Sequence, residues 1–264
     1  MQPSPWSNGR LNKLGDCIRD NLPVPDDLPN YDDVMVWYND LAAEVQRGIE
    51  AIDWSPLLGN RQPEITSRPK TIDTLRQKLV RQPRMSLARM QDIAGVRFDA
   101  EMTLDEQDGV AVAIAGIFNQ GPECTRDLRV TPHSGYRGVH LWLRLEGVRV
   151  EVQIRTHLQS EWANTYEAAG DLWGRGIRYD ETPNDPKVVS MVEALQSLST
   201  SVITQLEHAA NLIKRRELGD PSASDRDDRK LDDLKKGYVA REARFRTQLR
   251  DIRYALQTAS RKGV

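Results

Sequence analysis

Hydrophobic residues recur along this chain at two different spacings, and each spacing predicts its own kind of element. A spacing of three and four residues gives one apolar stripe on a helix, and it runs from about Asp32 through Val34, Trp37, Leu41, Val45 and Ile49. Comparable patterns predict helices over 107–118, 158–173 and 188–212, with a further helix from Arg229 to about Ser260. Most of the second half of the chain is therefore expected to be helical.

An alternation of apolar and polar residues covers 139–145 and 148–155, on either side of Glu146-Gly147. Two alternating runs around a turn-forming pair predict a β-hairpin. Its second strand would place Val148, Val150, Val152 and Ile154 on one face. The opposite face would carry Arg149, Glu151, Gln153 and Arg155. The apolar and β-branched content of Ile93 to Phe98 predicts another strand.

Prolines and small polar residues divide the chain. Five prolines in the first 30 residues argue against a long helix there and favour a loose or docked arm. Residues 53–68 are interpreted as a connector, with Pro69 in the first turn of a helix whose body is Ile72 to Leu79. We expect four parts: an arm and helix (1–64), a catalytic core (65–182), a long packing helix (183–216), and a linker with a basic helix (217–264).

The composition limits the class of protein. A length of 264 residues is enough for a full core, and Cys17 and Cys124 match no metal or redox spacing. No apolar run reaches the roughly 20 residues that span a bilayer, so no membrane insertion is expected. The amino terminus also lacks a signal pattern. These features predict a soluble, cytoplasmic protein.

The net charge of −2 hides a strong asymmetry. Successive segments 1–66, 67–100, 101–220 and 221–264 carry −6, +5, −6 and +5. Two basic blocks are therefore available for anionic partners, although a basic run is more often a solvated face.

Several clusters could carry chemistry. A basic group of Arg68, Lys70, Thr74 and Lys78 would suit a polyphosphate, since the last three would share one face of a helix beginning near Pro69. Asp92 and Glu151 are carboxylates next to or within predicted strands, the usual protein share of a magnesium site. Tyr136, at the edge of a turn, would stack on a base or simply pack on a helix. The four histidines lie at no zinc spacing with either cysteine, and the sequence has no Gly-rich phosphate loop.

Taken together, these motifs resemble a known family. Their order is Arg68-x-Lys70-x-x-x-Thr74-x-x-x-Lys78, Asp92-Ile-Ala-Gly-Val-Arg97, Gly135-Tyr136-Arg137-x-x-His140, Glu151-Val-Gln153-Ile-Arg155-Thr156, and Trp162-Ala163. The set resembles the synthetase domain of the RelA/SpoT family, and the chain looks like a small alarmone synthetase. The resemblance implies an α+β fold with a mixed five-stranded sheet flanked by helices.

The family resemblance also implies roles for single residues in Mg²⁺-dependent transfer of pyrophosphate from ATP to a ribose 3′-hydroxyl. Arg68 and Arg97 would hold the adenine, and Lys70 and Lys78 the ATP phosphates near Thr74. Asp92 and Glu151 would bind Mg²⁺, with Glu151 also the general base and Gln153 beside it. The implied acceptor-binding residues are Tyr136, His140, Arg126 and Arg155.

Departures from the family pattern bear on the acceptor. Pro132 stands where synthetases of guanosine alarmones usually carry a lysine, and His133 to Arg137 is most similar to the toxic branch from actinobacteria and phages. That branch implies the 3′-terminal adenosine of tRNA as the acceptor. The basic tail, including Lys235, Lys236 and Arg241, would then track tRNA phosphates.

Three functions therefore stand open: a tRNA-modifying toxin, a synthetase acting on GDP or GTP, and a catalytically silent module. A protein antitoxin and a homo-oligomer are further partners that the family resemblance leaves open.

Overall fold

The protein is described from a computed structural model that covers residues 3–223 and 231–262, with Arg68, Pro69 and Lys262 described by their backbone alone. The predicted start of the last helix at Arg229 lies outside these residues. The chain forms two compact units that interleave along the sequence. Unit 1 comprises Met1–Asp99, Gly109–Arg126 and His140–Ile154, and unit 2 comprises Ala100–Asp108, Asp127–Val139 and Arg155–Val264. The four consecutive parts expected from the sequence remain a prediction.

A five-stranded sheet in the order β1-β2-β5-β4-β3 confirms the α+β prediction. Its strands are β1 (Glu64–Pro69), β2 (Ala94–Ala100), β3 (Thr125–Asp127), β4 (Val139–Leu145) and β5 (Val148–Thr156). The predicted hairpin is β4 and β5. Its two turn residues, Glu146 and Gly147, have φ values of 31° and 86°. Two successive positive φ values are the geometry of a type I′ turn, which matches the twist of the flanking strands.

The prediction for residues 53–69 is wrong. A short helix α3 (Ser55–Leu58) and strand β1 occupy this segment, and Pro69 ends β1 instead of opening a helix. Pro69 is tolerated because β1 is an edge strand, where a missing N–H is no loss to the sheet. Helix α4 (Ile72–Arg81) begins later, after Thr71, whose side chain accepts a hydrogen bond from the Thr74 N–H. Lys70 therefore lies between β1 and α4 and not on the helix.

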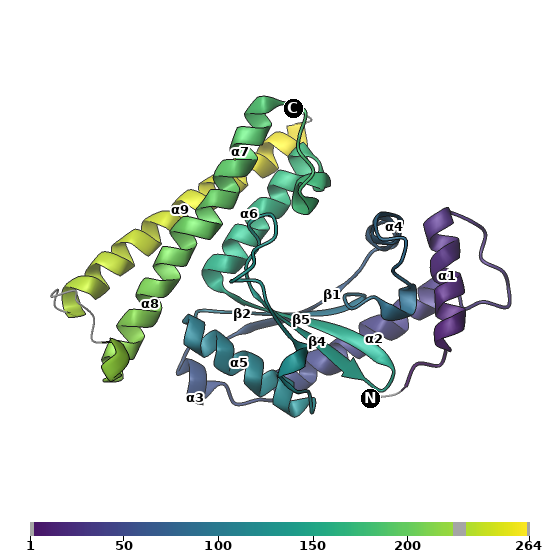
Figure 1. Ribbon diagram of the computed structural model, residues 1–264, viewed down its shortest axis with the longest axis horizontal. Helices are drawn as coiled ribbons and strands as arrows, with labels where there is room; N and C mark the ends of the chain where they lie inside the picture. The colour runs from purple at the N-terminus through teal and green to yellow at the C-terminus, as the bar shows by residue number, and fades with distance from the viewer. Residues whose placement is uncertain (1–2, 224–230, 263–264) are drawn as a thin grey trace. The chain divides into compact units, whose positions relative to one another are not determined.

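The expectation of an arm without a long helix at the amino terminus is also wrong, because helix α1 spans Asn8–Asp20. The prolines flank this helix and do not interrupt it, and its apolar side is buried through Leu11, Leu14 and Ile18. It packs against α4 and the short helix η1 (Leu87–Arg89). In Figure 1, α1 and α4 lie next to each other within this unit.

The predicted helix from Asp32 is confirmed as α2 (Tyr31–Glu50), which packs against β1. Helix α5 (Leu104–Ile117) and the short helix η2 (Pro122–Cys124) complete the elements between β2 and β3. Alternate residues of β2 are fully buried, and the Trp54 ring packs edge-on against Phe98. Because side chains alternate along a strand, the polar residues of β2 and β5 face the other side of the sheet.

Unit 2 is mostly helical. It contains α6 (His157–Trp173), η3 (Arg175–Tyr179), α7 (Pro186–Ser197), η4 (Leu198–Ile203), α8 (Thr204–Glu217), η5 (Pro221–Ala223) and α9 (Leu231–Lys262). The predicted helix 188–212 is confirmed as α7 and α8, joined by the π-helical turn η4. Figure 1 shows α6, α8 and α9 side by side. Trp162 stacks on Tyr166 in the core of this unit. Among the described residues, no helix is long and apolar enough to cross a membrane.

Candidate active site

Two lysines converge on one carboxylate in unit 1. Asp92 lies just before β2, and it forms an ion pair with Lys70 and another with Lys78, whose Nζ lies 2.8 Å from Asp92 Oδ1. Burial lowers the pKa of Lys70, and the neighbouring charge of Lys78 lowers it further, against the opposite pull of Asp92. The sequence predicted the two lysines on one helix face. The fold instead brings them together from a connection and from α4.

A second cluster surrounds Glu151 on β5. Its side chain accepts hydrogen bonds from Trp142 Nε1 at 3.3 Å and from Gln153 Nε2 at 2.7 Å, and its Oε1 lies 3.1 Å from His140 Nδ1. Burial by itself would raise the pKa of this carboxyl. The charge and hydrogen bond of His140, the amide of Gln153 and the field of Lys78 outweigh burial and lower the pKa to about 2. Glu151 is therefore an ionised carboxylate at neutral pH, although only 8% of the residue is exposed.

Trp142 is the residue that sequence reasoning missed. The Arg126 guanidinium lies 4.5 Å from the centre of the Trp142 ring, and the ring N–H donates to Glu151. Trp142 therefore links Arg126 to the buried carboxylate. The alternation along β4 was a usable signal, since it placed Trp142 on the same face as His140.

The other predicted donor-site residues have simpler surroundings. Arg97 is a half-buried residue of β2, and the backbone of Arg68 pairs with Gly95 of the same strand. Thr74 is half-buried near the start of α4, and its hydroxyl lies 2.7 Å from that of the capping residue Thr71.

The pair Asp92 and Glu151 suits Mg²⁺, which binds proteins through one or two carboxylates and takes its other ligands from phosphates and water. Both carboxylates act electrostatically on Lys70, so they lie in one charged region of unit 1. Within the described residues, no group of three or more His, Cys, Asp or Glu could hold a metal ion. This donor set fits a metal that arrives with its phosphate ligands.

Tyr136 and Arg155 belong to unit 2. The Tyr136 ring is half-buried and packs against the hydrophobic cluster of that unit, and Arg155 is only 1% exposed. Two interpretations of Tyr136 follow from the sequence, base stacking and packing within the protein. The structure shows the packing.

The predicted cations of the tail do not form a single row on α9. Lys235 is half-buried and pairs with Glu217 at 2.7 Å, whereas Lys236 and Arg241 are exposed. Lys236 and Arg241 are five positions apart on the α-helix, which turns their side chains about 140° from each other. One straight phosphate backbone cannot contact all three.

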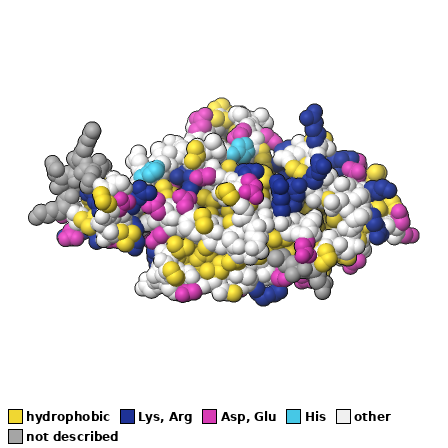
Figure 2. Space-filling view, turned by 60° about the horizontal axis from the view of Figure 1, so that its bottom comes forward, with side chains coloured by type: hydrophobic (Ala, Val, Ile, Leu, Met, Phe, Trp, Pro, Cys, Tyr) yellow, Lys and Arg dark blue, Asp and Glu magenta, His cyan; other side chains and the backbone are white. Residues whose placement is uncertain are grey.

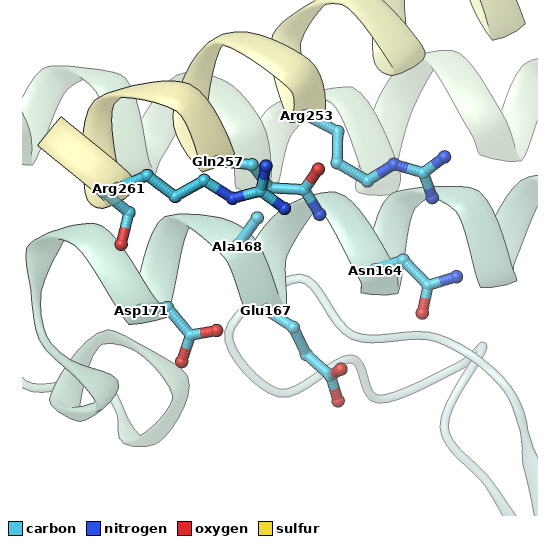
Figure 3. A pocket seen from close by; sticks show the side chains of 8 residues that line it. Asn164, Glu167, Ala168, Asp171, Arg253, Gln257 and Arg261 are labelled. Atoms are coloured by element: carbon cyan, nitrogen blue, oxygen red, sulfur yellow. The ribbon is translucent and has the colours of Figure 1, made fainter.

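A polar groove between α6 and α9 contains none of the predicted site residues. It is lined by Asn164, Glu167, Ala168, Asp171, Arg253, Gln257, Ser260 and Arg261. Figure 3 shows the side chains of Gln257 and Arg261 on α9 extending above Ala168 of α6, while Arg253 extends away from it. The carboxylates and lysines that meet at Asp92 and around Glu151 belong to unit 1.

Comparison with solved structures supports the fold. The chain is similar to small alarmone synthetase 1 from Bacillus subtilis, with a TM-score of 0.52, 20% identity, and coverage of 70% of this chain and 98% of that one. It is also similar to a GTP pyrophosphokinase family protein from Streptococcus pneumoniae, with a TM-score of 0.51, 19% identity, and coverage of 73% and 96%. At these identities the likeness establishes the fold.

Comparison of sequences establishes the family. Residues 67–170 match the region found in RelA / SpoT proteins. Uncharacterised proteins of Mycobacterium bovis and Mycobacterium tuberculosis are 50% identical over 194 residues, which is 74% of this chain and 70% of each relative. The chain therefore belongs to the same family as these mycobacterial proteins, a family that carries the RelA/SpoT region.

Proposed function

We propose that this protein transfers the β,γ-pyrophosphoryl group of ATP to a ribose 3′-hydroxyl, with the 3′-terminal adenosine of tRNA as the acceptor. The observation that carries the proposal is the arrangement in unit 1, where Lys70 and Lys78 meet at Asp92 and act electrostatically together with the buried carboxylate Glu151. A polyphosphate donor needs such fixed cations beside a metal-binding carboxylate pair.

ATP, the pyrophosphate donor, would bind at the first basic block, residues 67–100. Lys70 and Lys78 would exchange Asp92 for the phosphates of ATP, and Arg68 and Arg97 would hold the adenine near Thr74. Mg²⁺ held by Asp92 and Glu151 would neutralise charge on the transferred group. In the reaction, the 3′-oxygen bonds to the β-phosphorus and gives up its proton, the bond from that phosphorus to the oxygen that bridges the α- and β-phosphates breaks, and AMP leaves.

Glu151 would activate the hydroxyl group of the acceptor. A ribose hydroxyl is a poor nucleophile at neutral pH, and an ionised carboxylate within hydrogen-bond reach can accept its proton. Gln153 and His140 already hold the Glu151 side chain in place. Tyr136 would stack on the acceptor base, while Arg126 and Arg155 would contribute positive charge.

Two observations favour tRNA as the acceptor. Pro132 stands four residues before Tyr136, where the family resemblance leads us to expect a lysine in synthetases of guanosine alarmones, and Lys236 and Arg241 are exposed on α9. Figure 2 shows acidic side chains interspersed with basic ones on the face drawn, so long-range attraction of a nucleic acid to that face would be modest.

A protein that modifies tRNA ends would block translation, act as a cytoplasmic toxin and need a protein antitoxin.

A labelling experiment tests the proposal. The full chain is incubated with ATP labelled at the γ-phosphate and Mg²⁺, with GDP, GTP or deacylated tRNA as the acceptor. We expect label on the tRNA and little on either nucleotide. Label on GDP or GTP alone would make the protein a guanosine alarmone synthetase, and label on no acceptor would make it a silent module.

Two glutamates of the same hairpin provide matched variants. Glu151→Gln should lower transfer at least 100-fold, since the amide can neither accept the proton nor bind the metal strongly. Glu146→Gln at the exposed hairpin turn should leave transfer unchanged. Transfer that survives in Glu151→Gln would remove Glu151 from the reaction.

A further inference from the structure

The turn that carries Tyr136 is a tight structure in unit 2. The Tyr136 N–H donates to the His133 carbonyl at 2.8 Å, and the Leu128 N–H donates to the Gly138 carbonyl at 2.9 Å. Ser134 and Gly135 have φ values of 49° and 80°, so two successive residues adopt left-handed backbone. A turn of this kind needs outside contacts to keep one conformation.

One of these contacts is a buried ion pair with helix α8. Arg137 Nη1 lies 2.6 Å from Glu207 Oε2, and the two residues are 3% and 4% exposed. Arg137 directly follows Tyr136, so the pair fixes the backbone next to the ring. Breaking a buried pair by removing one partner leaves a charge without compensation, which makes the contact decisive for local structure.

The other carboxylate oxygen of Glu207 accepts hydrogen bonds from two neutral side chains. Its Oε1 accepts hydrogen bonds from Thr156 Oγ1 at 2.7 Å and from Gln159 Nε2 at 2.8 Å. Thr156 and Gln159 form the capping box at the start of α6. Glu207 therefore ties the Tyr136 turn to the first turn of α6 and to α8 at once.

The network continues to the other end of the same segment. Gln159 Oε1 accepts a hydrogen bond from Gln107 at 2.9 Å, and Gln107 in turn accepts one from Arg129 at 3.1 Å. Arg129 also pairs with Asp127 at 2.6 Å. Both ends of residues 127–139 are thus held by one chain of polar contacts that passes through α6 and is buried at Gln107, Gln159 and Glu207.

From this network we infer that Glu207 is a positioning residue for acceptor binding. It lies outside the matched region 67–170, yet it orders the turn on which the expected base-stacking residue sits. The inference rests on the proposed function in one respect: the role of Tyr136 in binding the acceptor. It assigns α8 a part in acceptor recognition, in addition to its packing in unit 2.

The test compares Glu207→Gln with Glu242→Gln in the full chain. Glu242 also forms a half-buried ion pair in unit 2, but its partner at 2.6 Å is Arg246 of the same helix α9. We expect Glu207→Gln to speed amide hydrogen exchange in residues 127–139 at least tenfold and to raise the KM for the acceptor about tenfold to hundredfold. The KM for ATP should change less than twofold, and Glu242→Gln should change none of these.

A conservative variant keeps the inference testable if Glu207→Gln folds poorly. Glu207→Asp retains the charge, and it should restore most of the exchange protection and part of the acceptor affinity. Unchanged exchange in both variants would overturn the positioning role, and faster exchange with an unchanged acceptor KM would overturn its link to the acceptor. Because exchange is measured without substrate, a wild-type protein that modifies no acceptor would count against the proposed function and leave the exchange result valid.

Discussion

At the scale of single residues, the carboxylate of Glu151 combines deep burial with full ionisation. Removing a carboxylate from water favours its neutral form, so burial alone would give this group a raised pKa. The contacts from His140 and Gln153 reverse that tendency and lower the pKa to about 2. A carboxylate stabilised this strongly is a weak proton acceptor before substrate binds, which favours metal binding as its first task.

The lowered pKa of Glu151 predicts acid sensitivity. The folded state releases this proton more readily than the unfolded chain, whose value is near 4.5, so the group stabilises the fold above about pH 4.5. This contribution is lost as the pH falls toward 2. The difference in unfolding free energy between wild type and Glu151→Gln should shrink by about 2 kcal/mol between pH 6 and pH 3. Urea unfolding at both pH values measures it, and a constant difference would contradict the lowered pKa.

At the scale of elements, the Tyr136 turn depends on a close approach of backbone to helix. A Cβ at Gly135 would lie 2.9 Å from Trp162 Cζ2 on α6 and 3.0 Å from the Cα of Gln196 on α7. Only glycine combines the left-handed backbone of this position with such contacts. The turn is therefore matched to the helices that follow it in the sequence.

Substituting this glycine should be costly. Gly135→Ala should lower the free energy of unfolding by roughly 2–4 kcal/mol, since strain in the backbone adds to overpacking. Gly147→Ala is the control, because Gly147 also has a positive φ but open space around it. The control should cost only about 1 kcal/mol. Equal losses for the two variants in urea unfolding would show that the helices do not crowd the turn.

At the scale of the whole molecule, charge is distributed in alternating blocks, but much of the carboxyl-terminal block is internally paired. Lys235 binds Glu217, and Arg246 lies within ion-pair distance of Glu101, Glu161 and Glu242. These pairs leave fewer cations for a nucleic acid than the +5 of residues 221–264 suggests.

Salt dependence tests this reduced charge. If two or three phosphate contacts are made, kcat/KM for tRNA should fall roughly tenfold to fortyfold between 50 and 200 mM salt. Lys236→Ala with Arg241→Ala should weaken this dependence and leave ATP binding unchanged. Lys235→Ala, which removes a paired cation, should have a smaller effect. If Lys235→Ala weakened the salt dependence as much as Lys236→Ala with Arg241→Ala, the assignment of Lys235 to an internal ion pair would be contradicted.

Local periodicity was sufficient to predict a strand or a helix wherever the apolar pattern is strong. The β4–β5 hairpin, strand β2 and helices α2, α5 and α6 could be predicted because each buries a continuous apolar face of its own. The pattern failed for β1, whose residues Glu64 to Ser67 include one strongly apolar side chain, and for α1, where flanking prolines suggested a broken segment. In both cases the element is stabilised by distant partners, β2 for the strand and α4 for the helix.

The sequence by itself therefore determined the residue types of the candidate site, the sheet face that carries Glu151, and the two basic blocks. Only the tertiary structure decided which charges meet. Lys70 and Asp92 are 22 positions apart, and Arg137 and Glu207 are 70 apart. The reason is physical: the position of a side chain on its own strand or helix follows from local backbone geometry, whereas its partner depends on how separate elements pack to bury their apolar faces.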